Sequence, residues 1–105
     1  MDRSICTEIA EFQVISAISD EAFIRIVEDL EENFHSKQGG FIDSELVRGN
    51  EHSQWLIIQH WDSAEQAKAA SKRMMKEPIT GKFRESLDPK TVKIRYLSNV
   101  LNWGR

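Results

Sequence analysis

Two side chains that could do chemistry stand together where an apolar run of the sequence ends. The stretch WLIIQHWDSAEQA, residues 55–67, places His60 and Trp61 directly before a segment with the composition of a helix. An imidazole can move protons near neutral pH, and an indole can stack on an aromatic ligand. The two residues could be a catalytic pair, a cofactor contact, or packing residues on opposite faces of a strand.

Alternation along the predicted strand separates these two side chains. One face of the run carries Trp55, Ile57, Gln59 and Trp61, and the other carries Leu56, Ile58 and His60. Successive side chains of a strand point to opposite faces, so His60 and Trp61 cannot line one pocket unless a bulge intervenes. We therefore do not expect a catalytic pair, and each residue remains a candidate by itself.

The other metal-binding residue types are scattered. We expect His35 at a helix end and His52 in a turn, both exposed to solvent, and Cys6 as a small strand residue without a partner. These residues lack the short or i, i+4 spacing of metal ligands, so the sequence predicts no metal. A lone cysteine agrees with a reducing compartment.

Composition and charge narrow the class of protein. The chain has 105 residues, of which 40% are hydrophobic and 30% charged, which predicts a single globular domain over residues 1–105. Acidic side chains outnumber basic ones 11 to 4 in residues 1–50, and basic ones outnumber acidic ones 10 to 6 afterwards. Nucleic-acid binding is disfavoured in an acidic chain without a basic stripe. No membrane span or signal peptide is recognisable, so we expect a cytoplasmic protein that does not bind membranes.

The elements that must position these residues follow from short periodic segments. Strands are expected over 7–15, 41–47, 54–61 and 91–101, with helices from Ser19 or Asp20 to Phe34 and from Ser63 to Pro78. The glycines of KQGG are expected to stop the first helix, and RGNEHS to form a hairpin turn. The order predicts a ferredoxin-like α+β fold (βαββαβ), with a four-stranded antiparallel sheet and two helices on one face.

The inner face of the second helix and both faces of the hairpin strand have further consequences. Three of the four inner residues of the helix, Ala67, Ala70, Ser71 and Met74, are small, so the helix either lies very close to the sheet or leaves room beneath it. The hairpin strand is apolar on both faces, and two helices can cover only one of them. A second copy of the chain is the economical cover, which predicts a homodimer through the sheet. A partner of different sequence is the alternative.

Several stretches resemble the antibiotic biosynthesis monooxygenase (ABM) family. They are GGF before the second strand, W…HWDSAEQAKAA across the third strand and second helix, and FRESLDPKTV before the last strand, and the resemblance spans about residues 7–98. It implies a dimeric α+β barrel with a pocket between sheet and helices in each subunit. It also implies activities as varied as cofactor-independent oxygenation of polyketide aromatics, quinol oxidation, haem degradation and isomerisation.

The family's functional positions carry over only in part. The haem-degrading branch has an asparagine on the first strand and a histidine in the second helix, where this chain has Ala10 and Ser71, so haem is disfavoured. The polyketide oxygenases have an asparagine where this chain has Ile57. The shared tryptophan, Trp61, is implied to face the pocket, either as packing or as a stacking surface. His60 is implied to face the partner sheet, as an interface residue or in proton transfer.

Three functions remain open at this stage. The first is a cofactor-independent monooxygenase of a small electron-rich aromatic such as a hydroquinone, and the second is a small-molecule binding or isomerising protein of the same fold. The third is a dimer whose pocket is filled by its own side chains. A ligand pocket would have an apolar wall and one or two polar anchors. The candidate substrate-binding residues are Phe12, Phe23, Phe41, Gln59, Trp61, Met74, Phe83 and Tyr96, with Gln59 and Tyr96 as the anchors.

Overall fold

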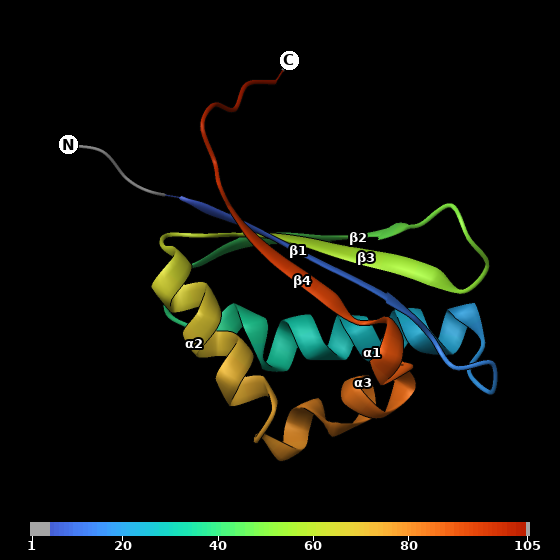
Figure 1. The fold of residues 1–105 in the computed structure, drawn as a ribbon. Helices are drawn as coiled ribbons and strands as arrows, with labels where there is room; N and C mark the ends of the chain where they lie inside the picture. The colour runs from blue at the N-terminus through green and yellow to red at the C-terminus, as the bar shows by residue number, and fades with distance from the viewer. Residues whose placement is uncertain (1–4, 105) are drawn as a thin grey trace.

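A four-stranded antiparallel sheet forms one layer of the structure, a computed structural model that describes residues 5–104 (Figure 1). The strands are β1 (Cys6–Gln13), β2 (Phe41–Arg48), β3 (Gln54–Trp61) and β4 (Lys93–Ser98), in the spatial order β2-β3-β1-β4. The pairings of β1 with β3 and with β4 join segments that are far apart in sequence. The predicted ferredoxin-like α+β fold is confirmed.

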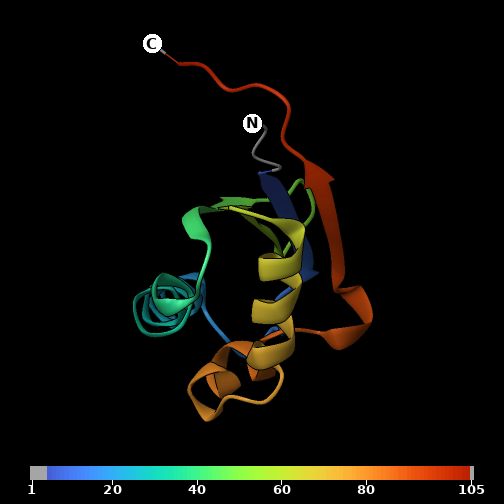
Figure 2. The ribbon, with the colours of Figure 1, turned by 90° about the vertical axis from the view of Figure 1, so that its left-hand side faces the viewer.

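The helices form the second layer. They are α1 (Asp20–Asn33), α2 (Ala64–Met74) and the short α3 (Gly81–Ser86), with single 3-10 turns η1 (His35–Lys37), η2 (Pro78–Thr80) and η3 (Pro89–Thr91) between elements. Figures 1 and 2 show the three helices on the same side of the sheet. Within residues 5–104, no helix covers the opposite face. None of the helices in this part of the chain is long and apolar enough to cross a membrane.

The predicted alternation of β3 is confirmed by burial. Trp55, Ile57, Gln59 and Trp61 are buried on the helix side, and the residues between them are half-buried. The register aligns Cys6 of β1 with Trp61 and Glu8 with Gln59, so the buried rows of both strands continue one another. The helix-facing side of the sheet is therefore one surface on which α1 and α2 rest.

Both expected helix caps form. Ser19 accepts a hydrogen bond from the backbone N–H of Ala22, and Ser63 accepts one from that of Gln66, which satisfies donors that a helix start leaves free. From α1, Phe23, Val27 and Leu30 are buried in the core. Their spacing places them on one stripe of the helix.

The end of α1 differs from the expectation. The helix stops at Asn33, and the chain continues through η1 rather than being ended by the glycines. Gly40 has φ of 87°, in the left-handed region, and its carbonyl accepts a hydrogen bond from Asp62 N–H at 2.7 Å. The glycine pair thus shapes the entry into β2, where a residue without Cβ is needed.

Replacing Gly40 with alanine is expected to destabilise the fold. An alanine there would adopt an unfavourable φ and its Cβ would overlap the side chain of Gln66, so we expect a loss of about 1–2 kcal/mol in the free energy of unfolding. Gly39→Ala is the matched control, because its Cβ would meet Gln66 only at 3.9 Å. Chemical denaturation measures both. Equal stabilities of the two variants would contradict the prediction.

Candidate functional site

A cavity of about 310 Å³, open to solvent on the side of Met75, Pro89 and Ile94, lies between the helix-facing side of the sheet and helices α2 and α3. The floor comes from β1 and β3, one wall from α2 and α3, and the far side from η3 and the start of β4. The lining residues are Glu8, Ala10, Phe12, His35, Ile57, Gln59, Trp61, Ala70, Ser71, Met74, Met75, Phe83, Arg84, Leu87, Pro89, Val92 and Ile94. Most of them are apolar.

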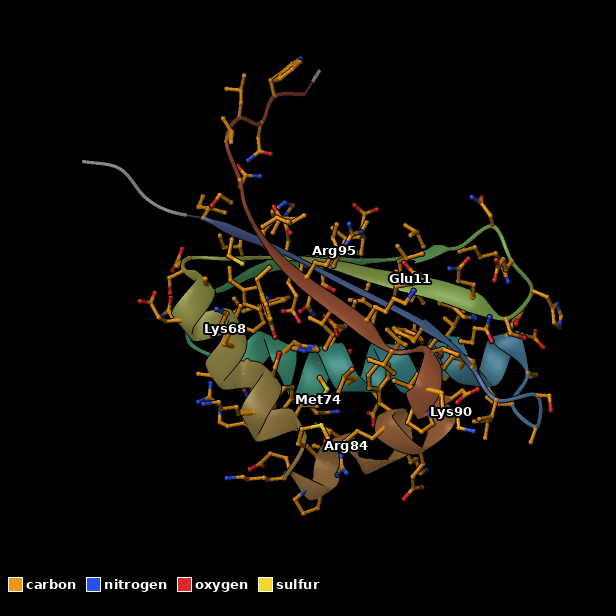
Figure 3. The ribbon with its side chains drawn as sticks, viewed as in Figure 1. Glu11, Lys68, Met74, Arg84, Lys90 and Arg95 are labelled. Atoms are coloured by element: carbon orange, nitrogen blue, oxygen red, sulfur yellow. The ribbon has the colours of Figure 1, made fainter. Side chains whose placement is uncertain are left out.

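The size of this space follows from the small residues of α2. Ala67 and Ala70 are buried against Trp61 and bring the first turns of the helix close to the sheet. Further along α2, Met74 points toward the interior of the molecule (Figure 3) and is only half-buried. Both sequence-based possibilities for this helix therefore occur, close packing at one end and a cavity at the other.

Aromatic side chains give the floor of the cavity a rigid shape. The rings of Phe12 and Phe83 meet edge to face at 5.7 Å, and Phe12 meets the buried Phe23 in the same manner at 5.9 Å. Such T-shaped contacts are favourable because the ring edge is positive and the face negative. The apolar end of the cavity is therefore preformed.

Polar groups gather at the opposite end. The Trp61 indole N–H donates to Gln59 Oε1 at 3.3 Å, and Gln59 Nε2 lies 3.5 Å from Ser44 Oγ. Ser71 Oγ lies 3.5 Å from Glu8 Oε2, at the limit of a hydrogen bond, and 2.9 Å from the Tyr96 hydroxyl. This end could hold the polar part of a ligand whose body fills the apolar end.

The expectation that His35 is exposed is wrong. Only 5% of its surface is accessible, because the 3-10 turn after α1 places the ring among Phe34, Phe41 and Trp61. Its Nδ1 lies 2.5 Å from Glu31 Oε2, one helical turn earlier. His35 also lines the cavity, so a titratable ring joins the polar end.

Glu8 is a second titratable group at this end, and it is 6% exposed. Burial raises the pKa of its carboxyl group above the ordinary value, because the charged form loses hydration. His35 and hydrogen bonds from Trp61 and Ser71 act in the opposite direction, and burial prevails. The site thus contains a carboxyl group that holds its proton more tightly than a surface glutamate.

Five of the candidate residues line the cavity: Phe12, Gln59, Trp61, Met74 and Phe83. Three others do not. Phe23 is fully buried in the core, Phe41 packs against Trp61 at 5.4 Å, and Tyr96 reaches the site only through its hydroxyl contact with Ser71. His60 lies on the opposite face of the sheet, where its Nδ1 is 2.7 Å from Asp43 Oδ1.

Sequence reasoning missed Glu8 and did not place His35. The signal for Glu8 was present, because it is two residues before Ala10 on a strand and so shares the face of Ala10 and Phe12. The signal for His35 was not, because its direction depends on the turn that follows α1. Helical periodicity carries no information beyond the end of the helix.

Two other features of the described residues bear on the site. A wider depression between α1 and β2 is open to solvent, and its lining includes Glu28, Asp29, Glu32 and Glu45, so it would not shield an aromatic ligand from water. Among residues 5–104, no group of three or more His, Cys, Asp or Glu side chains is arranged to hold a metal ion.

Comparisons with known proteins give the same architecture. The family model described as antibiotic biosynthesis monooxygenase matches residues 6–75. No curated protein matches the chain. A variant of SnoaB, a cofactor-independent oxygenase from Streptomyces nogalater, is similar in structure with a TM-score of 0.74 and 16% sequence identity, over 97% of this chain and 99% of that one.

Two further solved structures share the fold. One is described as a possible antibiotic biosynthesis monooxygenase from Nitrosomonas europaea, with a TM-score of 0.72 and 11% identity over 99% of this chain and 98% of that one. The other, described in the same way, is from Chloroflexus aurantiacus, with a TM-score of 0.68 and 17% identity over 96% and 98%. Identities this low support the fold alone.

Glu8→Gln is expected to stabilise the protein at alkaline pH. The folded-state pKa of Glu8 lies above its unfolded value, so the ionised carboxylate destabilises the folded protein. This destabilisation is absent below the unfolded-state pKa and complete above the folded-state pKa. The variant should therefore melt above the wild type at about pH 8, and the difference should vanish near pH 4. Each kcal/mol moves Tm by about 4–8 °C in a domain of this size.

The matched control is Glu11→Gln. Glu11 lies on the same strand but on the other face, half-buried, and accepts a hydrogen bond from Gln54. Scanning calorimetry of both variants across pH measures the effect. A Glu8→Gln protein that melts below the wild type at alkaline pH would mean that the carboxylate is needed for folding.

Proposed function

This chain belongs to the antibiotic biosynthesis monooxygenase family, and we propose that it is a cofactor-independent monooxygenase of a small electron-rich aromatic, such as a hydroquinone or a polyketide-like phenol, bound between sheet and helices. The observation that carries the proposal is the cavity of about 310 Å³ beside Trp61, apolar over most of its wall and polar at one end. That volume is at the lower bound for a small-molecule site and suits one or two aromatic rings.

In this mechanism the protein binds, orients and desolvates, and the substrate supplies the electrons. A hydroquinone that has lost a proton is a strong reductant, and dioxygen is the oxidant. One oxygen atom bonds to a ring carbon and the O–O bond breaks. The other oxygen leaves as water with two hydrogens from the substrate, so a hydroquinone and dioxygen give a hydroxyquinone and water.

Trp61 and Gln59 have the positions that this mechanism needs. Only 1% of the surface of Trp61 is accessible, so its indole packs beneath α2 rather than stacking on a ligand. Its N–H fixes Gln59 Oε1, so the amide is oriented before a ligand arrives. Phe12 and Phe83 form the apolar part of the wall. Excluding water strengthens the interactions of a bound anion with fixed dipoles.

A second candidate is a binding or isomerising protein with no oxygen chemistry. It is favoured by one observation, namely that Glu8 and His35 both line the polar end of the cavity. Two titratable groups at one end could move a proton between two positions of a substrate. The two candidates use the same residues and differ in whether oxygen is consumed.

We also infer that the protein is a cytoplasmic homodimer built on the open face of the sheet. That face carries the apolar side chains Ile9, Val47, Leu56, Ile58 and Leu97. Beyond β4, the chain leaves the sheet (Figure 1), and Trp103 there is 84% exposed. Apolar surface of this extent is usually covered in solution. The buried, free Cys6 agrees with a reducing compartment.

Oxygen consumption tests the proposed activity. We expect the protein to consume oxygen with members of a panel of hydroquinones and anthrone-like aromatics. In Trp61→Phe, kcat/KM should fall about two- to twelvefold, the loss expected for a hydrogen bond of about 0.5–1.5 kcal/mol, because Gln59 Oε1 loses the N–H that orients it. Trp103→Phe is the matched control and should match the wild type. If the native protein binds such compounds but consumes no oxygen, the binding or isomerising candidate takes precedence.

Sedimentation tests the dimer. The native protein should sediment at about twice its chain mass of 12.2 kDa. His60→Ala should weaken the dimer by about 1–3 kcal/mol, because it leaves Asp43 without its partner in the interface. His52→Ala, in the exposed hairpin turn, should not. A monodisperse native monomer would overturn the dimer.

A further inference from the structure

The polar end of the cavity contains a carboxyl group that binding and desolvation do not require. We propose that Glu8 is the general base that takes the phenolic proton of the bound substrate, and that His35, held by Glu31, positions and balances its charge. The inference rests on the proposed function, because it requires a substrate with an ionisable hydroxyl group. It narrows the substrate class to phenols and hydroquinones that enter with that hydroxyl first.

Glu8 has the location that a base needs. It lies on β1, paired with Gln59 on one side and Tyr96 on the other, in the middle of the helix-facing side of the sheet. Ser71 of α2 approaches Glu8 Oε2, and Ser71 is itself fixed by the Tyr96 hydroxyl. The carboxyl group is thus held from the α2 side while it lines the cavity.

The groups around Glu8 set its charge. They are Cys6 from its own strand, Gln59 and Trp61 from β3, Tyr96 from β4, Ser71 from α2, Glu31 from α1 and His35 from η1. Lys68 of α2 lies over the Tyr96 ring, and Arg84 of α3 lines the same cavity. His35 is the group whose charge lowers the pKa of Glu8, and Glu31 holds the ring in place through Nδ1. Loss of His35 would therefore make Glu8 harder to ionise.

The raised pKa of Glu8 suits this task. A carboxylate with an ordinary pKa is a weak acceptor for a phenolic proton, because the two acids differ greatly in strength. Burial moves Glu8 toward the phenol and toward neutral pH, where a general base is most effective. The cost in stability described above is the counterpart of this gain.

The proton balance closes without another reactant. The phenol O–H bond breaks, its proton goes to Glu8, and the electron pair stays on the substrate oxygen. The anion then reduces dioxygen as described above. When the O–O bond breaks, the proton on Glu8 passes to the oxygen that leaves as water, which restores the carboxylate.

The first arm of the test follows kcat against pH with a hydroquinone that the native protein oxidises. In the wild type, kcat should rise with pH through the ionisation of Glu8. In Glu8→Gln it should fall about 100-fold or more near neutral pH with little change in KM, the usual contribution of a general base. It should recover as the substrate ionises by itself at alkaline pH. Glu11→Gln, on the opposite face (Figure 3), should follow the wild type.

His35→Gln separates the two titratable groups. If Glu8 is the base, this variant should keep the rise of kcat with pH but shift it to higher pH, because the interaction with His35 that lowers the pKa of Glu8 is lost. If His35→Gln removes the rise and Glu8→Gln keeps it, His35 is the base and the proposal is wrong.

The second arm uses para-nitrophenol, which binds as a phenol but does not react with oxygen, and whose anion is coloured. The phenolic oxygen of the bound nitrophenol and the carboxyl group of Glu8 must hold one proton between them. Above the pKa values of both groups, binding therefore takes up a proton, and the affinity of the wild type should fall about tenfold per pH unit. In Glu8→Gln the amide can donate to the phenolate, and the affinity should become independent of pH. Calorimetric titrations in buffers of different ionisation enthalpy measure directly how many protons are taken up when nitrophenol binds.

The two arms distinguish the two proposals. Proton-linked nitrophenol binding without oxygen consumption would overturn the oxygenase and leave Glu8 as the acceptor of a phenolic proton. Oxygen consumption that is the same in Glu8→Gln and the wild type would overturn the role of Glu8 and leave the oxygenase. Absence of both nitrophenol binding and oxygen consumption in the native protein would overturn both.

Discussion

The contact between Trp61 and the small residues of α2 determines how the rest of the site is built. Ala67 and Ala70 have almost no side chain to separate helix from sheet, so the indole fills the space and sets the distance between the layers. The same indole orients Gln59 through its N–H. Further along α2, Ser71 and Met74 line the cavity together with Ala10 and Ile57 of the sheet.

This arrangement explains why a carboxyl group and an imidazole can be buried in so small a domain. Glu8 and His35 are both more than nine-tenths buried, and neither could be kept there as an isolated charge. Glu31 supports His35, Ser71 and Trp61 support Glu8, and the two groups oppose each other in charge. A buried carboxyl group such as Glu8 reduces stability when ionised, so its retention is better explained by a role in the cavity than by folding.

The sequence predicted the faces of the strands well and the depth of individual residues poorly. Alternation in β3 is a property of the extended backbone, so the separation of Trp61 from His60 needed no tertiary information. Whether Phe23 lines a cavity or fills the core depends on the tilt of α1 against Trp55 and Phe83, which no local pattern records. Tyr96 lies on the predicted face of the sheet, but it reaches the site only through the contact of its hydroxyl group with Ser71. The position of Ser71 depends on how α2 packs.

His35 and His60 also show that the sequence does not reveal how deeply a residue is buried, and this depth decides which histidine lies at the cavity. His35 and His60 each lie beside a carboxylate, Glu31 at 2.5 Å and Asp43 at 2.7 Å, and their local sequences do not distinguish them. What differs is the face of the sheet. His60 and Asp43 lie on the open face, where 63% of the Asp43 side chain is accessible in a single chain and a partner sheet could cover it. His35 is enclosed with a second carboxyl group, Glu8, at the end of a cavity. Proton transfer to a bound molecule needs an enclosed acceptor within reach of that molecule, and only the inner pair satisfies this condition.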